Sequence, residues 1–322
     1  MGNLPGCFYP TEVVFVDDNE NYLQMLSMFL SKNDEGILLK TFSDPEKALT
    51  YINTSATTQQ QVIGEQTDCF TPNCYAMKFN IFSLHKQIYN PQRYHQVSVV
   101  IADHDLNSDC IDGIRFCQKI ENKNIQKILF TGQQDQKFVI QAFNSGYIQH
   151  YVSKNEIRNL DELMKILKDS QRKFFRTCTN PLDVVITPNK GYPLAIYSDV
   201  FRSFFEKFLK ENQIFEYYLL EGVGSFLLID AEHHFKLLLV QNEDQFLANY
   251  LELQDEVSEE QRNLLKMGNI LYYDSKFLCD THHPHHCGFT PASTLIDGNK
   301  RFFYGVVSVD DWFPRDKINF CY

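Results

Sequence analysis

The chain has 322 residues, of which 43% are hydrophobic and 14% aromatic, enough apolar material for two domains of ordinary size. Its net charge of −11 argues against a surface dominated by nucleic-acid binding, and no apolar run reaches the roughly 18 residues of a membrane span. Nine cysteines without the spacing of a disulfide framework, and an N-terminus without a secretory pattern, predict a cytoplasmic protein.

Short apolar runs alternate with amphipathic helical patterns over the first half of the chain. Strands are predicted over 11–16, 37–42, 97–102, 128–131 and 148–152, and helices from residue 20 onward and over 46–52, 112–122, 136–144 and 156–176. The polar segment from about 53 to 92 is interpreted as an insertion with little regular structure. Five strand–helix repeats predict a doubly wound, five-stranded parallel sheet.

Polar side chains follow or end the predicted strands. Asp17 and Asp18 come after the first strand, Asp103 after the third, Thr131 ends the fourth, and Lys154 follows the fifth. Because the carboxyl ends of parallel strands meet at one edge of the sheet, we expect these side chains to converge there.

Three carboxylates in one crevice repel one another, and a hard divalent cation relieves this repulsion. Oxygen ligands favour Mg²⁺ over zinc or copper. A carboxylate beside Mg²⁺ can attack phosphorus and form an aspartyl phosphate, with a lysine and a hydroxyl binding the phosphoryl oxygens. The residue types therefore favour phosphoryl transfer.

This pattern resembles the receiver domain of two-component response regulators over residues 11–176. The resemblance implies a flavodoxin-like fold, Mg²⁺ as the cofactor, and a histidine kinase or phosphotransfer protein as the phosphodonor. It also implies site residues: a phosphoacceptor (Asp103), Mg²⁺ ligands (Asp17, Asp18, Asp103 and the main chain of Asp105), and phosphoryl-binding and switch residues (Thr131, Lys154 and Tyr151).

The loop after the third strand departs from the family pattern. It lacks the usual proline, and Gly113 comes ten residues after Asp103, so an alternative register makes Asp105 the acceptor. We prefer Asp103 because the apolar strand ends there. Asp112 is expected to cap the following helix, and His104 is expected to be exposed to solvent.

The second half is predicted to be an α+β output domain of unclassified type. We assign residues 1–178 to the receiver and 179–322 to the output domain, joined by a junction over 177–189. A helix capped by the run Tyr197-Ser198-Asp199 is predicted to about residue 211, and a hairpin turns at 230–234. Helices follow over 244–253 and 258–265, and strands are expected over 217–220, 225–229, 235–240, 270–273 and 301–309.

One local cluster of metal-ligating residues stands out in this half. It comprises His282, His283, His285, His286 and Cys287. Such a cluster can bind zinc, while the alternative interpretation is a flexible loop with adventitious metal affinity.

We interpret the chain as a response regulator in which phosphorylation of Asp103 alters dimerisation or output contacts. The output domain has abundant aromatic residues, and from residue 181 onward it has 12 Lys and Arg against 21 Asp and Glu, which favours a protein partner over nucleic acid. A closer resemblance is to quorum-sensing response regulators of the Legionella type. The alternatives are a DNA-binding transcriptional regulator and an enzymatic output that uses the His-rich loop.

Overall fold

The computed structural model describes residues 4–33, 37–59, 87–106, 112–132, 136–154, 160–185, 194–221, 223–253, 255–274 and 286–313, together with residues 318 and 320. These residues form two compact units. Those within 9–59 and 90–178 make up the first, and those within 4–8, 87–89 and 179–318 make up the second. Within these ranges, no helix has the length and apolar character that crossing a bilayer requires.

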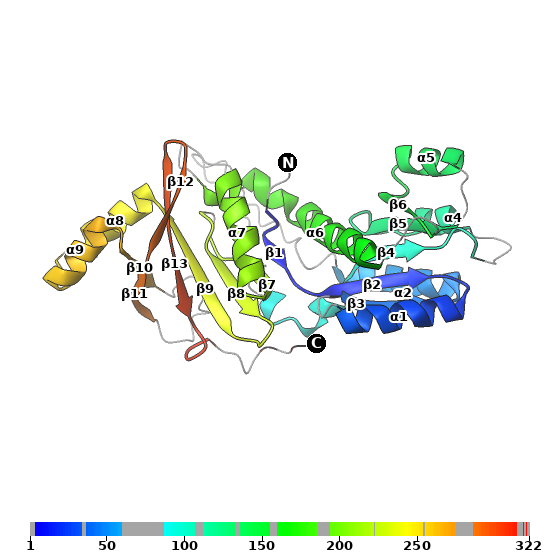
Figure 1. Cartoon of the computed structure of the whole chain (residues 1–322), viewed down its shortest axis with the longest axis horizontal. Coiled ribbons are helices and arrows are strands. Elements are labelled where there is room, and N and C mark those ends of the chain that lie inside the picture. Colours follow the sequence, from blue (N-terminus) through cyan, green and yellow to red (C-terminus); the bar gives the residue numbers. More distant parts are fainter. Residues whose placement is uncertain are drawn as a thin grey trace. The chain divides into compact units, whose positions relative to one another are not determined.

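The first unit is built on a parallel sheet of five strands. These are β2 (Thr11–Val16), β3 (Ile37–Phe42), β4 (Val97–Ala102), β5 (Gln126–Thr131) and β6 (His150–Ser153), in the order β3-β2-β4-β5-β6 (Figure 1). Every residue of β2, β4 and β5 is buried, because both faces of the sheet are covered. The predicted flavodoxin-like fold is confirmed.

Helices follow the strands of this sheet. They are α1 (Glu20–Asn33), α2 (Pro45–Gln59), α4 (Gly113–Gln118), α5 (Gln136–Asn144) and α6 (Leu160–Val185). Of these, α1, α2, α4 and α6 pack on the two faces of the sheet. Alternate strand residues such as Phe15 and Phe130 pack with α1 and α6 in one hydrophobic core. The other face contacts α2 and α4.

Two of these helices extend beyond their predicted ends. Helix α2 continues from the expected end at residue 52 to Gln59. The hydroxyls of Thr50 and Thr54 in this helix donate hydrogen bonds to main-chain carbonyls one turn earlier. Helix α6 extends into the predicted junction as far as Val185 and includes Pro181. A proline removes one main-chain donor, and the turns on either side of it can still form. Most of the predicted insertion, residues 60–86, lies outside the described residues.

The second unit is an α+β arrangement around an antiparallel sheet. The order is β1 (Cys7–Phe8), β7 (Ile214–Leu219), β8 (Phe226–Asp230), β9 (Phe235–Asn242), β13 (Lys300–Ser308) and β12 (Ser293–Asp297). A separate pair is formed by β10 (Ile270–Asp274) and β11 (Cys287–Pro291), and the helices are α7 (Asp199–Glu211), α8 (Glu243–Leu253) and α9 (Glu259–Met267).

The sheet of the second unit has an aromatic helix contact on each face. Phe205 of α7 packs against Phe226, with ring centroids 4.4 Å apart, and Phe246 of α8 stacks on Phe303 at 4.2 Å. The predicted cap is present, since Ser198 accepts a hydrogen bond from the main chain of Phe201. Strands β1, β11 and β12 were not predicted, because β1 has only two residues and β11 and β12 are largely exposed.

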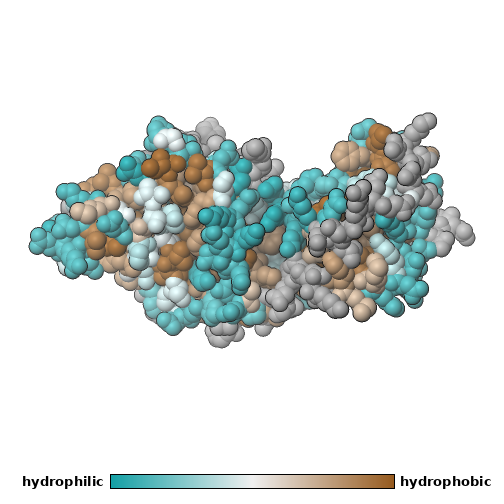
Figure 2. All heavy atoms as spheres, viewed as in Figure 1, coloured by the Kyte–Doolittle hydropathy of each residue, from teal (hydrophilic) through white to brown (hydrophobic). Residues whose placement is uncertain are grey.

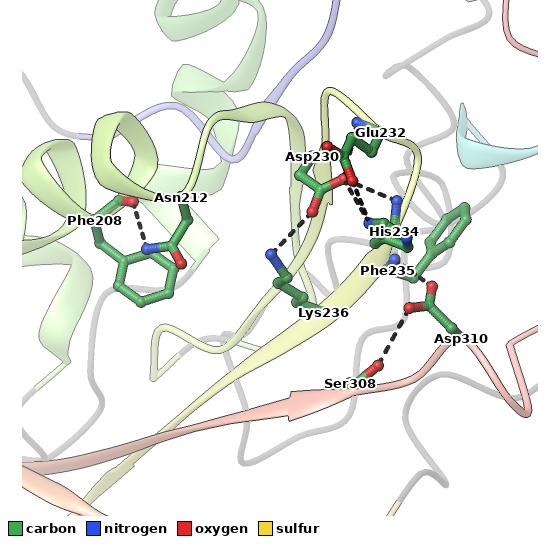
Figure 3. A network of polar contacts seen from close by, with 9 residues as sticks. All are labelled: Phe208, Asn212, Asp230, Glu232, His234, Phe235, Lys236, Ser308 and Asp310. Atoms are coloured by element: carbon green, nitrogen blue, oxygen red, sulfur yellow. Dashed lines mark hydrogen bonds and ion pairs between the residues drawn. The ribbon is translucent and has the colours of Figure 1, made fainter.

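The turn between β8 and β9 is closed by one buried carboxylate (Figure 3). Asp230 accepts hydrogen bonds from the main-chain N–H groups of Glu232 and His234, and its other oxygen is 2.9 Å from the Nζ of Lys236. Asp310 accepts a hydrogen bond from the main-chain N–H of Phe235. These contacts fix the predicted hairpin through local polar groups.

Candidate functional site

The chemically useful side chains lie at the carboxyl ends of the parallel strands. Asp17 follows β2, Asp103 follows β4, Thr131 ends β5 and Lys154 follows β6. The carboxylates of Asp17, Asp18 and Asp103 offer oxygens that all lie within 4.8 Å of one another. The structure therefore brings together side chains from positions 17, 18 and 103, as the strand ends predicted.

Lys154 bridges two of these carboxylates. Its Nζ is 2.7 Å from the Oδ2 of Asp17 and 2.9 Å from the Oδ2 of Asp103. Asp17 has no exposed side-chain surface, and Asp103 is 10% exposed. The three groups thus lie close together with little exposure to solvent, so the electrostatic interaction among them is strong.

The other oxygen of each carboxylate is held by the main chain. The Oδ1 of Asp17 accepts a hydrogen bond from the N–H of Asn19, and that of Asp103 accepts one from the N–H of His104. These contacts leave one oxygen of each carboxylate directed to Lys154. The local loops therefore set the orientation of both side chains before any ligand arrives.

Gly113 packs against the main chain of Asp103. A Cβ built on Gly113 would lie 2.1 Å from the carbonyl oxygen of Asp103, and the N–H of Gly113 donates to the carbonyl of His104 at 2.9 Å. Asp112 caps α4 by accepting a hydrogen bond from the N–H of Arg115, as predicted. Gly113 is required here for close backbone approach.

Burial and charge shift the acid–base properties of the site. Burial raises the pKa of Asp103, against the lowering effect of the hydrogen bond and charge of Lys154. Burial alone would lower the pKa of Lys154, but its hydrogen bonds to Asp17 and Asp103 and the charges of these residues outweigh burial and raise it. Lys154 therefore stays cationic at neutral pH and serves as the fixed counter-ion of the cluster.

Two aromatic rings border the ammonium group of Lys154. Its Nζ lies 4.8 Å from the ring centroid of Tyr22 and 5.8 Å from that of Phe130. Burial, followed by the charges of Asp17 and Asp103, raises the pKa of Tyr22 to about 12. Helical periodicity places Tyr22 on the apolar side of its helix with Leu23 and Leu26 and gives no sign that it borders Lys154.

The remaining predicted site residues have more varied surroundings. Thr131 is buried, and its carbonyl accepts the N–H of Lys154 at 2.9 Å. Tyr151 is half-buried within β6, opposite Leu129, while Asp105 is exposed. His104, expected to be exposed, is half-buried, because its backbone is drawn in by Asp103 and Gly113.

The His-rich cluster is only partly described. His282, His283 and His285 lie outside the described residues. His286 stacks on Trp312 with ring centroids 5.0 Å apart, and Cys287 is exposed at the start of β11. Among described residues, the carboxylates at 17, 18 and 103 form the one group of three or more side chains suited to a metal ion.

Comparison with known proteins agrees with this fold. No protein-family model and no curated protein matches the chain. The Legionella pneumophila response regulator LqsR is similar over 98% of this chain and 93% of its own, with 26% identity and a TM-score of 0.73.

Two receiver domains match about half of the chain. One belongs to an HD domain-containing protein from Pseudomonas fluorescens (22% identity, 52% of this chain, 90% of that chain, TM-score 0.35). The other is a CheY-like receiver from Methanospirillum hungatei (14% identity, 52% of this chain, 98% of that chain, TM-score 0.34). The chain is thus similar over nearly its whole length to a Legionella response regulator, and its first unit has the five-stranded parallel sheet of a flavodoxin-like receiver fold.

Proposed function

We propose that the chain is a two-component response regulator that accepts a phosphoryl group on Asp103 from a histidine kinase or phosphotransfer protein. The observation that carries the proposal is the bridge of Lys154 between Asp17 and Asp103 beside Asp18. A nucleophilic carboxylate, a fixed cation and two further oxygen ligands in one crevice suit phosphoryl transfer.

In the proposed step, a carboxylate oxygen of Asp103 attacks the phosphorus of a phosphohistidine. A P–O bond forms and the P–N bond breaks, so that the electron pair goes to the imidazole nitrogen, which then takes a proton. Lys154 already lies 2.9 Å from Asp103 and would neutralise an oxygen of the incoming phosphoryl group. The product is an acyl phosphate at Asp103 and a free histidine on the donor.

A divalent cation fits the acidic set. The carboxylates at positions 17, 18 and 103 are hard oxygen ligands, and we assign Mg²⁺ to them together with the main-chain carbonyl of Asp105. When bound, Mg²⁺ would supply positive charge to the transferring oxygens. Lys154 offsets part of the carboxylate repulsion in the absence of a metal.

Burial supports Asp103 over Asp105 as the acceptor. Asp103 is buried at the end of β4 and touches Lys154, whereas Asp105 is exposed two residues further on. Strand packing fixes where β4 ends, so it also fixes the position of Asp103 relative to β2 and β6.

The switch residues are proposed to respond to the new charge. Phosphorylation adds about −2 charge, which would draw the Thr131 hydroxyl toward the phosphoryl group and allow Tyr151 to move inward. Thr131 is buried beside the main chain of Lys154, and Tyr151 is half-buried. We propose that this rearrangement changes dimerisation or contacts of the output domain with a partner protein.

The test is phosphorylation by acetyl phosphate with Mg²⁺, followed by intact-mass analysis. The wild type and Asp105→Asn are expected to gain one phosphoryl group, and Asp103→Asn is expected to gain none. If Asp103→Asn still gains a phosphoryl group and Asp105→Asn does not, the acceptor is at position 105. Sedimentation velocity with beryllofluoride then tests dimerisation. A larger species is expected only when Asp103 is intact.

A further inference from the structure

A cavity of about 370 Å³ lies between α4 and α5 of the receiver unit. Its walls include apolar side chains from both helices and from the segment that follows α5, among them Ile114, Phe138, Ala142 and Tyr147. Ligand sites in proteins commonly have volumes of roughly 300–1,000 Å³ and combine apolar walls with a few polar groups. This cavity is therefore large enough for a small molecule.

The polar groups of the cavity carry little uncompensated charge. Asp112 and Arg115 both contribute to the wall, and they already pair with each other at 3.6 Å. The side chains of Gln118 and Gln141 are neutral. A ligand with a net charge would have to break the existing pair or lose water without a new partner, so the lining favours a neutral ligand.

The imidazole of His104 has a buried nitrogen without a hydrogen-bond partner among the described residues. The residue lines the cavity, and this nitrogen is its Nδ1. A buried polar atom in this state costs free energy, and a ligand hydroxyl or N–H group recovers it once the imidazole turns to bring this nitrogen to the cavity surface. The two aromatic residues, Phe138 and Tyr147, offer ring faces for an aromatic ligand.

Helix α5 is packed weakly against the rest of its unit. Phe138, Ile140 and Phe143 are 60%, 57% and 54% exposed, and hydrophobic surface gathers over this helix (Figure 2). Phe138 lines the cavity, whereas Ile140 and Phe143 do not. A helix with so few buried contacts can adjust to a ligand at low cost, and the same helix supplies matched control positions.

The cavity wall is joined directly to the proposed phosphoacceptor. The N–H of His104 donates to the Oδ1 of Asp103 at 2.8 Å, and the carbonyl of His104 accepts the N–H of Gly113. Any change in the position of the Asp103 carboxylate is therefore transmitted to a residue that touches the cavity. A ligand that shifts His104 can therefore shift the Asp103 carboxylate as well, and so change the rate of phosphoryl uptake.

We propose that the α4–α5 cavity binds a small neutral aromatic molecule that carries a hydrogen-bonding group, and that its occupancy alters phosphoryl uptake at Asp103. The binding site stands on the geometry of the cavity alone, while the second half of the proposal rests on the proposed function. The described lining of the cavity offers aromatic ring faces and one unpaired nitrogen. A small molecule with one ring and one hydrogen-bonding group matches both, so we take the ligand to be a free small molecule.

The binding test uses 4-fluorophenol, a neutral aromatic probe with one hydroxyl, followed by ¹⁹F NMR on the full chain. The probe is expected to bind, with amide shifts at His104, Ile114 and Ala142 in the ¹H–¹⁵N spectrum. Phe138→Ala is expected to weaken binding about tenfold, because one ring face is lost. Phe143→Ala, on the same helix and equally exposed, is expected to leave the affinity unchanged.

The anionic probe 4-fluorobenzoate tests the chemical class. It is expected to bind at least tenfold more weakly than 4-fluorophenol, because Arg115, the cation in the described part of the wall, already faces Asp112. Equal effects of Phe138→Ala and Phe143→Ala, or preference for the anionic probe, would overturn the proposed site.

Coupling is measured separately, as the rate of phosphoryl uptake from acetyl phosphate with and without saturating 4-fluorophenol. The rate is expected to change at least twofold in the wild type and in Phe143→Ala, and the same change in Phe138→Ala should require about tenfold more probe. Binding with an unchanged rate would overturn the coupling. A chain that binds the probe but takes up no phosphoryl group under any condition would contradict the proposed function and leave the site standing.

Discussion

The ammonium group of Lys154 lies 2.7 Å from the Oδ2 of Asp17, a carboxylate with no side-chain surface exposed to solvent. The same ammonium reaches Asp103 at 2.9 Å, so one cation compensates two buried anions. Such a pair contributes little when intact, because desolvation offsets the attraction, but it is costly to break from one side.

Replacing Lys154 by alanine is expected to lower the free energy of unfolding by about 2 kcal/mol, because Asp17 and Asp103 lose their counter-ion. Added Mg²⁺ should stabilise this variant more than the wild type, since a cation can then occupy the acidic set without displacing Lys154. Urea unfolding with and without Mg²⁺ measures both effects. The exposed pair of Lys207 and Glu211 provides the control, and Lys207→Ala should cost less than about 0.5 kcal/mol.

The pH dependence of stability should show the raised pKa of Asp103. Because the folded protein holds this proton more tightly than the unfolded chain, stability falls as pH rises from 3.8 through the raised pKa. Asp103→Asn has no titrating carboxyl group at this position, so it does not lose stability in this way as pH rises. The variant should therefore gain stability relative to the wild type across that range, on the order of 1 kcal/mol.

Asp44 gives the opposite sign and so serves as the control. Its pKa is lowered, first by the hydrogen bond from the main chain of Lys47, so its contribution to stability is lost as pH falls through the lowered value. Asp44→Asn should become less stable than the wild type as pH rises. Urea titrations at a series of pH values compare both variants. A difference between Asp103→Asn and wild type that does not depend on pH would contradict the raised pKa.

Substitution of Gly113 by alanine should displace Asp103, the proposed phosphoacceptor. The added methyl would lie 2.1 Å from the carbonyl oxygen of Asp103, so the loop must shift. We expect a loss of about 1–3 kcal/mol in the free energy of unfolding and slower phosphoryl uptake. Gly132→Ala is the control, because a Cβ there meets no atom within 4 Å, and its stability should change by less than about 0.5 kcal/mol.

Another buried carboxylate of the receiver unit, at the amino end of the parallel sheet, should be sensitive to the loss of one hydrogen-bond donor. Glu12 is 2% exposed and accepts a hydrogen bond from the hydroxyl of Tyr51 on α2, and its other oxygen lies 3.1 Å from the Nδ1 of His95. Burial, followed by the hydrogen bond to Glu12, raises the pKa of Tyr51. Tyr51→Phe should therefore cost about 1–2 kcal/mol.

Hydrogen exchange provides the local readout for Tyr51→Phe. Faster exchange is expected in α2 and in the turn at Pro91–His95, since Glu12 joins both to β2. The double variant Tyr51→Phe with Glu12→Leu should recover part of the loss, because it leaves no buried carboxylate. Equal exchange in wild type and Tyr51→Phe would contradict a stabilising contact.

The sequence by itself determined the receiver fold and the location of its site. Apolar runs end at Val16, Ala102 and Thr131, and strand ends are fixed by packing, so the positions of Asp17 and Asp103 followed from hydrophobic pattern alone. The caps at Asp112 and Ser198 also followed from local chemistry, because a cap depends on residues three positions away.

Only the tertiary structure decided which groups touch. Sequence periodicity could not show that Tyr22 borders Lys154. Nor could it show that Gly113 packs against the main chain of Asp103 or that His104 is half-buried. These contacts join segments that only the folded sheet brings together. Periodicity also could not show that Cys7–Phe8 joins a sheet with β7, since a two-residue strand carries no pattern of its own. Local propensity fixes elements and their ends, and the contacts between distant segments arise only from the packing of the complete fold.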